Sequence, residues 1–415
     1  MIGSALRVLI CLCLIALFGY GAPAWAASRA ETEAAFQTWL RQEVAADAAR
    51  KGVTDATLAR AFKGLTLDWS LPDLAPPGQA VGEEPQRQAE FQSPARYFNE
   101  AGIRALANRG RSQFRRLSRT LSAIEDRYGV PPSVIVAIWG RESGFGTARL
   151  KHSAIRVLAT QAFMGARKES FYPELIAALQ ILEGDHITVA QMRSSWAGAL
   201  GQPQFMPSRF LTTAVDFDRT GRRDIWTSVP DVLASIANFL KQAGWQPSVG
   251  WGFEVAVPAN VSCTLEGPDQ GKPISQWMAM GVRNPGGTPI NPRDADQLMH
   301  LLMPAGRFGP AFLVSNNFYV LKSYNESDLY ALFIGHLADR IRGGGPFIGR
   351  WSNVGDFKRS EVRAMQERLE GRGIDVGSAD GLVGFKTRRA VGNWQAEHGM
   401  EATCFPDAEL LSAVK

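Results

Sequence analysis

The chain has 415 residues, of which 45% are hydrophobic and 20% are charged. This composition is too apolar for a disordered protein and too polar for a protein with several membrane spans, and the length suits about two or three domains. The 45 Lys and Arg residues and 40 Asp and Glu residues give a net charge of +5 without a compact basic block. Nucleic-acid binding therefore has no support from the sequence.

The first 26 residues have the features of a secretory signal. Arg7 precedes an apolar run over residues 8–18, and residues 24–26 (AWA) provide a cleavage site. The apolar run is shorter than the roughly 20 residues that span a bilayer. We predict a cleaved signal peptide at 1–26 and an exported, periplasmic chain that begins near Ala27.

Cysteine and histidine patterns argue against metal and redox chemistry. Cys263 and Cys404 are the cysteines left after cleavage, and they fall in what we predict to be different domains. We therefore predict two buried free thiols, with a disulfide as the alternative. The five histidines form no i, i+4 pair, and neither a P-loop nor a GxSxG nucleophile motif is present. The remaining class of catalysis is carboxylate chemistry.

Helical spacing dominates the chain and predicts a mainly α fold. Helices are expected at 31–62 (one or two), 103–128, 131–143, 173–183 and 229–244, with a proline-rich loop at 66–94. Alternation predicts a few short strands at 251–261, 311–314 and 318–321. We predict a catalytic domain over 27–342, a linker over 343–357 and a separate unit over 358–415.

The helix predicted at 131–143 ends in an acidic residue. Residues 134–139 make it apolar nearly all round, so it must be buried, and Glu142 lies at its C-terminal end before Gly144. The helix dipole and the apolar surroundings both disfavour the ionised form and raise the pKa of Glu142. Such an acid can protonate a leaving glycosidic oxygen. A surface glutamate on a fraying helix end is the alternative from this local argument.

Several motifs follow one another with characteristic spacing. They are GRESGFG at 140–146, SWAGALG at 195–201, QFMPS at 204–208, NNFY at 316–319 and SYN at 323–325. In order and spacing they resemble the signatures of the lytic murein transglycosylase B family, over roughly residues 95 to 340. The resemblance implies a lysozyme-like helical fold. It also implies cleavage of the MurNAc-GlcNAc bond of peptidoglycan with formation of a 1,6-anhydro sugar.

The family chemistry fits the single acid that the sequence offers. Ordinary glycosidases need two carboxyl groups, whereas in a transglycosylase the substrate's own 6-hydroxyl is the nucleophile, so Glu142 can serve as acid and then as base. No cofactor is required.

By position in the motifs, six further residues would bind substrate. Ser195 and Asn325 would hydrogen-bond the acid or an N-acetyl group, Gln204 would line the cleft, and Tyr324, Tyr330 and Tyr97 would shape the subsites. A packed core aromatic is the alternative for each tyrosine. Phe239 stands where relatives often carry tyrosine.

A loop after the third motif resembles a calcium site. Asp216, Asp218, Thr220 and Asp224 match positions 1, 3, 5 and 9 of an EF-hand, but Thr227 replaces the bidentate glutamate at position 12. The resemblance implies that some relatives bind calcium here with a later aspartate, a role open to Asp231. An Asp-rich turn without a metal is the alternative to a structural calcium.

Residues 358–415 resemble a small three-helix peptidoglycan-binding domain. Helices are expected at 360–371 and through Trp394 to His398. Its role would be to raise the local concentration of the catalytic domain on glycan strands, and a packing module without a ligand is the alternative. We expect a monomer whose partner is peptidoglycan. A hydrolytic muramidase and a non-catalytic scaffold are the competing functions.

Overall fold

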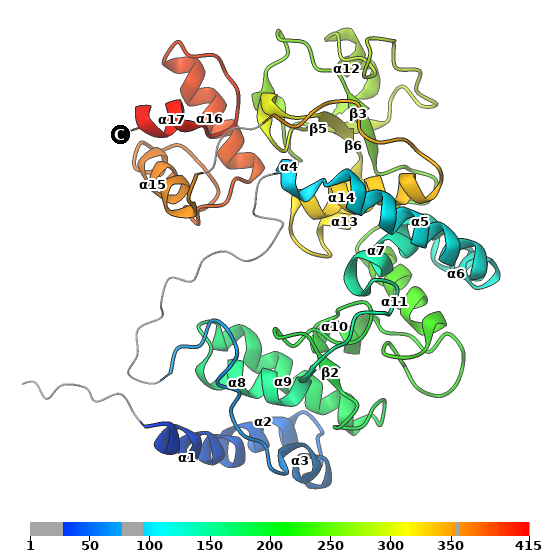
Figure 1. Ribbon diagram of the computed structural model, residues 1–415, viewed down its shortest axis with the longest axis vertical. Coiled ribbons are helices and arrows are strands. Elements are labelled where there is room, and N and C mark those ends of the chain that lie inside the picture. The colour runs from blue at the N-terminus through cyan, green and yellow to red at the C-terminus, as the bar shows by residue number, and fades with distance from the viewer. Residues whose placement is uncertain (1–27, 77–93, 353–356, 415) are drawn as a thin grey trace, which may run out of the picture.

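The computed structural model describes residues 28–76, 94–352 and 357–414. The predicted signal peptide lies outside these residues. Within them the chain is mostly helical with a few short strands, which confirms the predicted fold class. Figure 1 shows α1–α3, α8 and α9 in one lobe, the four-stranded sheet with α13 and α14 in another, and α7 and α11 between them.

The N-terminal region forms one long helix with a π turn, followed by a short helix. The elements are α1 (Arg29–Trp39), η1 (Leu40–Val44), α2 (Ala45–Arg50) and α3 (Asp55–Phe62). Ser28 and Glu31 form a capping box at the start of α1. Phe36 and Trp39 pack on Phe163 of α8, with ring centroids 5.3 Å apart in both pairs. The N-terminal helices therefore extend the main hydrophobic core.

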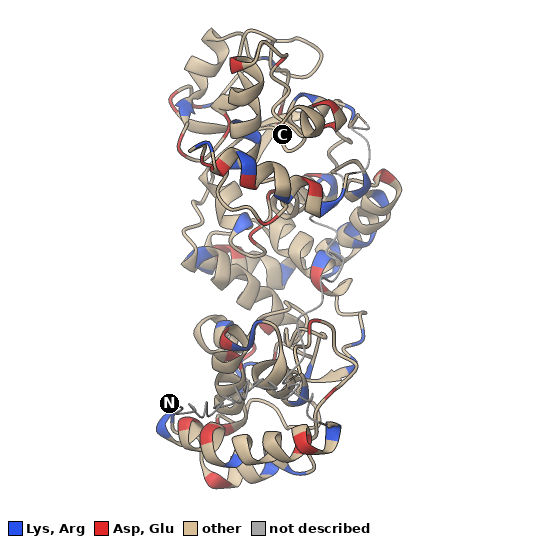
Figure 2. Ribbon diagram, turned by 90° about the vertical axis from the view of Figure 1, so that its left-hand side faces the viewer, with Lys and Arg blue, Asp and Glu red and all other residues tan. Residues whose placement is uncertain are grey.

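The helices that follow build the main hydrophobic core. They are α4 (Pro94–Tyr97), α5 (Glu100–Arg116), α6 (Ser118–Tyr128), α7 (Pro132–Ser143), α8 (Ala154–Met164), α9 (Lys168–Glu183), α10 (Pro207–Thr213), α11 (Val229–Gln242), α13 (Asn316–Lys322) and α14 (Asp328–Ile341). Helix α7 is packed by α5, α6, α11 and α14, which explains why its sequence is apolar on nearly every side. Figure 2 shows charges of both signs interspersed over these helices.

The strands form two antiparallel sheets. The small sheet pairs β1 (His152–Ser153) with β2 (Arg193–Ser194). The larger sheet has the order β3-β6-β5-β4 and comprises β3 (Gly252–Val255), β4 (Lys272–Pro273), β5 (Leu298–Leu302) and β6 (Ala311–Val314). Together with α12 (Ile274–Ala279), the 3-10 turn η3 (Cys263–Leu265) and the 3-10 turn η4 (Gly306–Phe308), it surrounds a second core around Trp277, which is 0% exposed.

One predicted strand is a helix. Residues 318–321 belong to α13, so the strand prediction there is wrong. The Ser315 hydroxyl accepts the backbone N–H of Asn317 and caps this helix. The Asn317 side chain donates to the carbonyls of Gln246 and Val249 at 2.9 and 2.7 Å, which fixes the helix against the preceding loop.

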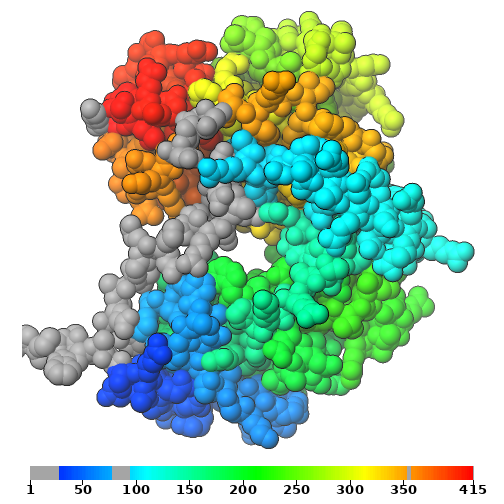
Figure 3. All heavy atoms as spheres, viewed as in Figure 1, coloured from blue at the N-terminus to red at the C-terminus, as the bar shows by residue number. Residues whose placement is uncertain are grey.

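The C-terminal residues form three helices with a core of their own. They are α15 (Arg359–Glu370), α16 (Phe385–Glu397) and α17 (Ala408–Ala413). The prediction of free thiols is wrong, because Cys404 forms a disulfide with Cys263 of η3. The two cysteines lie in different units, but α16 packs directly on η3 and brings them together. Figure 3 shows the red C-terminal part of the chain lying against its yellow and green part.

Candidate active site

Helix α7 is buried along most of its length and carries Glu142 in its last turn. Pro132 occupies the first turn, and residues 134–139 are at most 4% exposed. Gly144 ends the helix with a left-handed φ of 56°. Glu142 itself is only partly buried. The buried turns before it hold its carboxyl group in place.

Tyr330 donates a hydrogen bond to Glu142. Its hydroxyl lies 2.5 Å from Oε1 of the carboxyl group, and the side chain is 1% exposed. Tyr330 lies in the first turn of α14, where the Ser327 hydroxyl caps the helix. Burial and then the charge of Glu142 raise the pKa of Tyr330 well above its ordinary value. The tyrosine therefore stays protonated near neutral pH and remains a donor to the carboxyl group.

Tyr324 lies beside Tyr330 and reaches across to another loop. The two rings are stacked, with centroids 6.1 Å apart and an interplanar angle of 12°. The Tyr324 hydroxyl donates to the carbonyl of Pro203 at 2.8 Å, and burial raises the pKa of this tyrosine as well. The ring of Phe239 packs 4.7 Å from that of Tyr324. Phe239 therefore supports Tyr324 through its ring.

Ser195 and Gln204 order the loop that Tyr324 contacts. The Ser195 hydroxyl accepts the backbone N–H groups of Ala197 and Ala199 at 3.3 and 3.1 Å. Gln204 has a positive φ of 55°, and its amide donates to the Gly201 carbonyl at 2.7 Å. Both side chains thus fix backbone in the segment 195–205, where the sequence predicted contacts to substrate or to the acid.

Gln202 is a structural link that the sequence analysis missed. Its side-chain oxygen accepts the indole N–H of Trp139 at 2.7 Å, and its amide donates to the Trp226 carbonyl at 2.8 Å. The residue thereby joins α7 to the loop that contains Gln204. Gln202 lies between the motifs at 195–201 and 204–208, and no sequence pattern marks it as a link.

Tyr97 reaches the end of α7 through Arg141, a second missed residue. The Arg141 guanidinium donates to the Tyr97 hydroxyl at 2.9 Å and lies over the rings of Tyr97 and Phe333 at 4.9 and 4.8 Å. Tyr97 is 9% exposed, whereas Asn325, on the connection between α13 and α14, is exposed. Tyr330 therefore contacts Glu142 directly and Tyr324 stacks on Tyr330. Tyr97 contacts Arg141, next to Glu142, and Asn325 lies at the surface.

Comparison with known families shows the family to which the chain belongs. Residues 35–339 match the family model described as a transglycosylase SLT domain. The chain belongs to the transglycosylase SLT family. Residues 358–414 match the model of a peptidoglycan binding domain.

Two relatives extend the comparison. Membrane-bound lytic murein transglycosylase B of Escherichia coli (strain K12) is 34% identical over 224 residues, covering 52% of this chain and 58% of that protein, so the chain matches little more than half of the length of this curated relative. SltB3 from Pseudomonas aeruginosa, in complex with NAG-NAM-pentapeptide, has a TM-score of 0.83 and 37% identity, covering 92% of this chain and 99% of that one. A second SltB3 complex contains NAG-anhNAM-pentapeptide and gives a TM-score of 0.80.

The acidic loop of this SLT family member gathers three of the five predicted calcium ligands. Carboxylate oxygens of Asp216, Asp218 and Asp231 lie within 4.8 Å of one another. Asp224 instead accepts the N–H groups of Trp226 and Thr227, both at 2.8 Å. A Thr220 N–H donates to Asp216 at 2.9 Å. Burial raises the pKa of Asp231, and a hydrogen bond from the Ser228 hydroxyl lowers that of Asp218.

The oxygen donors of these residues fit a calcium ion. Each of the three carboxylates already accepts N–H or O–H donors, and each oxygen has lone pairs beyond those used. The loop lacks the bidentate glutamate of an EF-hand. A calcium complex is known for Slt35 of Escherichia coli, which has a TM-score of 0.51 and 27% identity, covering 61% of this chain and 80% of that one.

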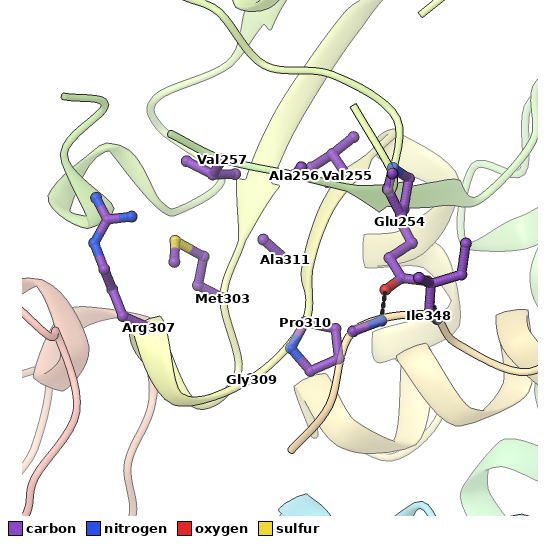
Figure 4. Close-up of a pocket in the computed structure, with 13 residues that line it drawn as sticks. Glu254, Val255, Ala256, Val257, Met303, Arg307, Gly309, Pro310, Ala311 and Ile348 are labelled. Atoms are coloured by element: carbon purple, nitrogen blue, oxygen red, sulfur yellow. Dashed lines mark hydrogen bonds between the residues drawn. The ribbon is translucent and has the colours of Figure 1, made fainter. Parts of the chain in front are cut away.

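A pocket in the larger sheet lies apart from the predicted site residues. It is lined by β3, β6 and residues 348–349, and Figure 4 shows Glu254 turned toward Ile348. Glu254 accepts the N–H groups of Ile348 and Gly349 at 2.9 and 2.6 Å. These bonds hold the segment after α14 on the sheet edge, a structural role for this carboxylate.

Proposed function

We propose that this protein is a lytic transglycosylase that cleaves the MurNAc-GlcNAc β-1,4 bond of peptidoglycan, with Glu142 as acid and then base. The observation that carries the proposal is the Tyr330 hydroxyl 2.5 Å from Glu142 at the end of the buried helix α7. Membership of the transglycosylase SLT family supports the reaction class, and the two peptide-bearing sugars bound to SltB3 support the substrate class.

A single carboxyl group is sufficient for this reaction. Glu142 gives its proton to the oxygen that joins C1 of MurNAc to GlcNAc, and the C1–O bond breaks. The 6-hydroxyl of the same MurNAc attacks C1, and the Glu142 carboxylate takes the proton of that hydroxyl. The products are a 1,6-anhydro-MurNAc end and a GlcNAc with a free 4-hydroxyl, so no water is consumed. Because the nucleophile is tethered, attack needs no second reactant.

The surrounding side chains position the acid. Tyr330 holds one carboxyl oxygen and stays protonated, so Glu142 keeps one orientation in both protonation states. Tyr324 ties α14 to the 195–205 loop through Pro203, and Gln202 ties that loop to α7. Ser195 and Gln204 then shape the surface that faces the sugar. Asn325 is exposed on the neighbouring connection and is the candidate for a direct contact with an N-acetyl group.

The remaining parts of the chain place this chemistry on the cell wall. The features of residues 1–26 support export to the periplasm, where peptidoglycan lies. Among the described residues, no helix is both long and apolar enough to cross a membrane. The match of residues 358–414 to a peptidoglycan binding domain supports binding to glycan strands. Sacculi should therefore retain the full chain, and a chain that lacks this domain should pellet with them less.

Mass spectrometry of purified peptidoglycan digested with the chain from Ala27 onward tests the proposal. Transglycosylation gives fragments that are lighter than hydrolytic fragments by one water and carry no reducing end. A Glu142→Gln variant should give none of them while remaining folded. Glu125→Gln, the same change at an exposed position on α6, is the matched control and should leave the products unchanged.

Two other outcomes would replace the proposal. Fragments with a reducing end would make the protein a hydrolytic muramidase, which needs a second carboxylate to activate water. No fragments, together with retention on sacculi, would make it a non-catalytic scaffold.

A further inference from the structure

A buried cluster of charges joins the C-terminal domain to the catalytic region. Arg388 of α16 is 2% exposed and donates to both carboxylate oxygens of Glu266, which is 0% exposed, at 2.9 and 2.6 Å. The same guanidinium donates to Asp328 at 2.9 Å. Lys322 forms an ion pair with the other oxygen of Asp328 at 2.8 Å. Two cations and two carboxylates make the cluster neutral.

The cluster joins the end of α13 to the start of α14, the region that contains Tyr324 and Tyr330. Lys322 is the last residue of α13, and Asp328 is the first residue of α14. Tyr324 lies between these two residues, and Tyr330 follows Asp328 by two positions. The ion pair between Lys322 and Asp328 therefore closes the segment 322–328 into a loop, and Arg388 holds that closure from the C-terminal domain.

Arg388 is the cation that the buried Glu266 and Asp328 share. The charges of Lys322 and Arg388 lower the pKa of Asp328, although burial alone would raise it. If Arg388 is removed, the fully buried Glu266 loses its cation, and Asp328 keeps Lys322 but loses the guanidinium that held its other oxygen. The first turn of α14 is then no longer fixed to the C-terminal domain through Asp328.

Attachment of the domain does not depend on Arg388 alone. The Cys263–Cys404 disulfide links the same two units covalently. Arg389, the next residue, pairs with Asp269 at 2.8 Å at the edge of the interface, where the two side chains are 25% and 58% exposed. Arg388 differs from these contacts because it alone of the three reaches α14.

We propose that Arg388 is a positioning residue of the active site: the C-terminal domain uses it to fix the start of α14 and, through α14, the tyrosine that orients Glu142. This inference rests on the proposed catalytic role of Glu142 and Tyr330. The domain is then part of the catalytic machinery in addition to any binding to the wall.

Kinetics on purified sacculi with the full mature chain test the inference. Arg388→Met should lower kcat at least tenfold and change sacculus binding less than twofold, since the orientation of Glu142 is lost while the disulfide keeps the C-terminal domain attached. The matched control, Arg389→Met, should leave kcat and KM within twofold. Equal losses in both variants would overturn the inference, because they would report damage to the interface in general.

A double variant separates positioning from stability. Arg388→Met with Glu266→Gln leaves Asp328 paired with Lys322 and restores charge balance, so the Tm should recover relative to Arg388→Met. We expect kcat to stay low, because Asp328 still lacks its guanidinium. Recovery of kcat together with Tm would show a merely structural role and overturn the inference. If Glu142→Gln retained activity, the proposed function would fail instead, whatever the Arg388 variants show.

Discussion

Two acidic residues on neighbouring helices have opposite environments. Asp231 lies in the first turn of α11, is 0% exposed and accepts backbone N–H groups from Phe217, Asp218 and Asp224 at 2.7, 3.2 and 2.9 Å. Glu142 lies in the last turn of α7, is partly exposed and accepts a tyrosine hydroxyl. Figure 1 shows the two helices between the lobes.

The difference separates a structural carboxylate from a chemical one. At a helix N-terminus, burial raises the pKa of Asp231 while the amide donors act in the opposite direction, and its hydrogen bonds hold a loop in place. At a helix C-terminus, Glu142 faces the negative end of the helix dipole and accepts the hydroxyl of Tyr330. The most buried acid of the pair is therefore not the catalytic candidate. Chemistry requires an acid that substrate can reach and whose two protonation states are close in free energy.

The largest expected effect is the loss of activity on replacing Glu142. Glu142→Gln keeps the shape but removes the proton donor, so kcat should fall by about 10² to 10⁴-fold. The free energy of unfolding should stay the same or rise, because an acid at a helix C-terminus is removed. Release of soluble muropeptides and urea unfolding measure the two effects. A variant that lost stability in proportion to activity would contradict the contrast with Asp231.

Replacing Asp231 should have the opposite pattern. Asp231→Ala leaves three N–H groups of the loop without their acceptor, at a cost of about 4 kcal/mol in the free energy of unfolding. Activity of the protein that remains folded should change little. Asp269→Ala removes an exposed carboxylate that pairs with Arg389 and should cost less than about 1 kcal/mol. Similar losses for both variants would show that the Asp231 hydrogen bonds are not decisive.

His336 on α14 extends the comparison to a buried base. It is 4% exposed and stacks on Phe347 with ring centroids 3.8 Å apart. Burial, and then the charge of Arg340, lower its pKa to about 4, although Glu100 acts in the opposite direction. The unfolded chain binds a proton at this histidine near pH 6.5, whereas the folded chain does so only near pH 4. The folded state therefore has its full stability above pH 6.5 and loses stability as the pH falls toward 4.

The size of this pH effect can be measured by difference. Linkage gives about 3 kcal/mol lost by pH 4 through this one group. Urea unfolding at pH 7 and pH 4.5 should therefore show a smaller decrease in stability for His336→Phe than for the unaltered chain. The same decrease in both proteins would assign the acid sensitivity to other groups.

Much of the fold follows from local signals. The apolar run before Glu142 predicts α7 to within one residue, and β6 is predicted with its observed bounds. The strand predicted at 318–321 was wrong because Phe318, Val320 and Leu321 are residues that also suit a strand. The hydrogen bonds of Asn317 to the preceding loop stabilise a helix there instead. The disulfide depended on how the C-terminal unit docks, and spacing in the sequence holds no signal for that.

Candidates for the site can be predicted where one position is enough, and not where contacts between distant residues decide. The place of Glu142 on α7 nominates it, and the family motifs nominate Tyr324 and Tyr330, whose stacked rings lie beside it. The roles of Arg141, Gln202 and Arg388 arise from hydrogen bonds between residues 44, 63 and 122 positions apart. Their partners become neighbours only after the lobes have packed.

Calcium provides a smaller test of the acidic loop. If the loop binds the ion, a free concentration about 100 times the Kd should stabilise the protein by about 2.7 kcal/mol and raise its Tm. Asp218→Asn should abolish this increase, because Asp218 is the exposed ligand of the three and its loss spares the Asp231 bonds. Magnesium is the control, since it prefers a smaller octahedral site. If calcium did not raise the Tm, the hydrogen bonds of Asp231 would hold the loop without a metal.

The smallest expected effect separates the two stacked tyrosines. Tyr330→Phe removes the donor to Glu142 and should lower kcat about tenfold, a barrier increase of about 1.4 kcal/mol. It should also shift the alkaline limb of the pH–rate profile, where Glu142 loses the proton that it must donate, because the Tyr330 hydroxyl binds the carboxyl group. Tyr324→Phe is the matched variant: its hydroxyl donates to Pro203, so KM should rise while the pH–rate profile keeps its position. If both variants shifted the profile equally, the two hydroxyls would act on Glu142 as one network, and the specific role assigned to Tyr330 would be wrong.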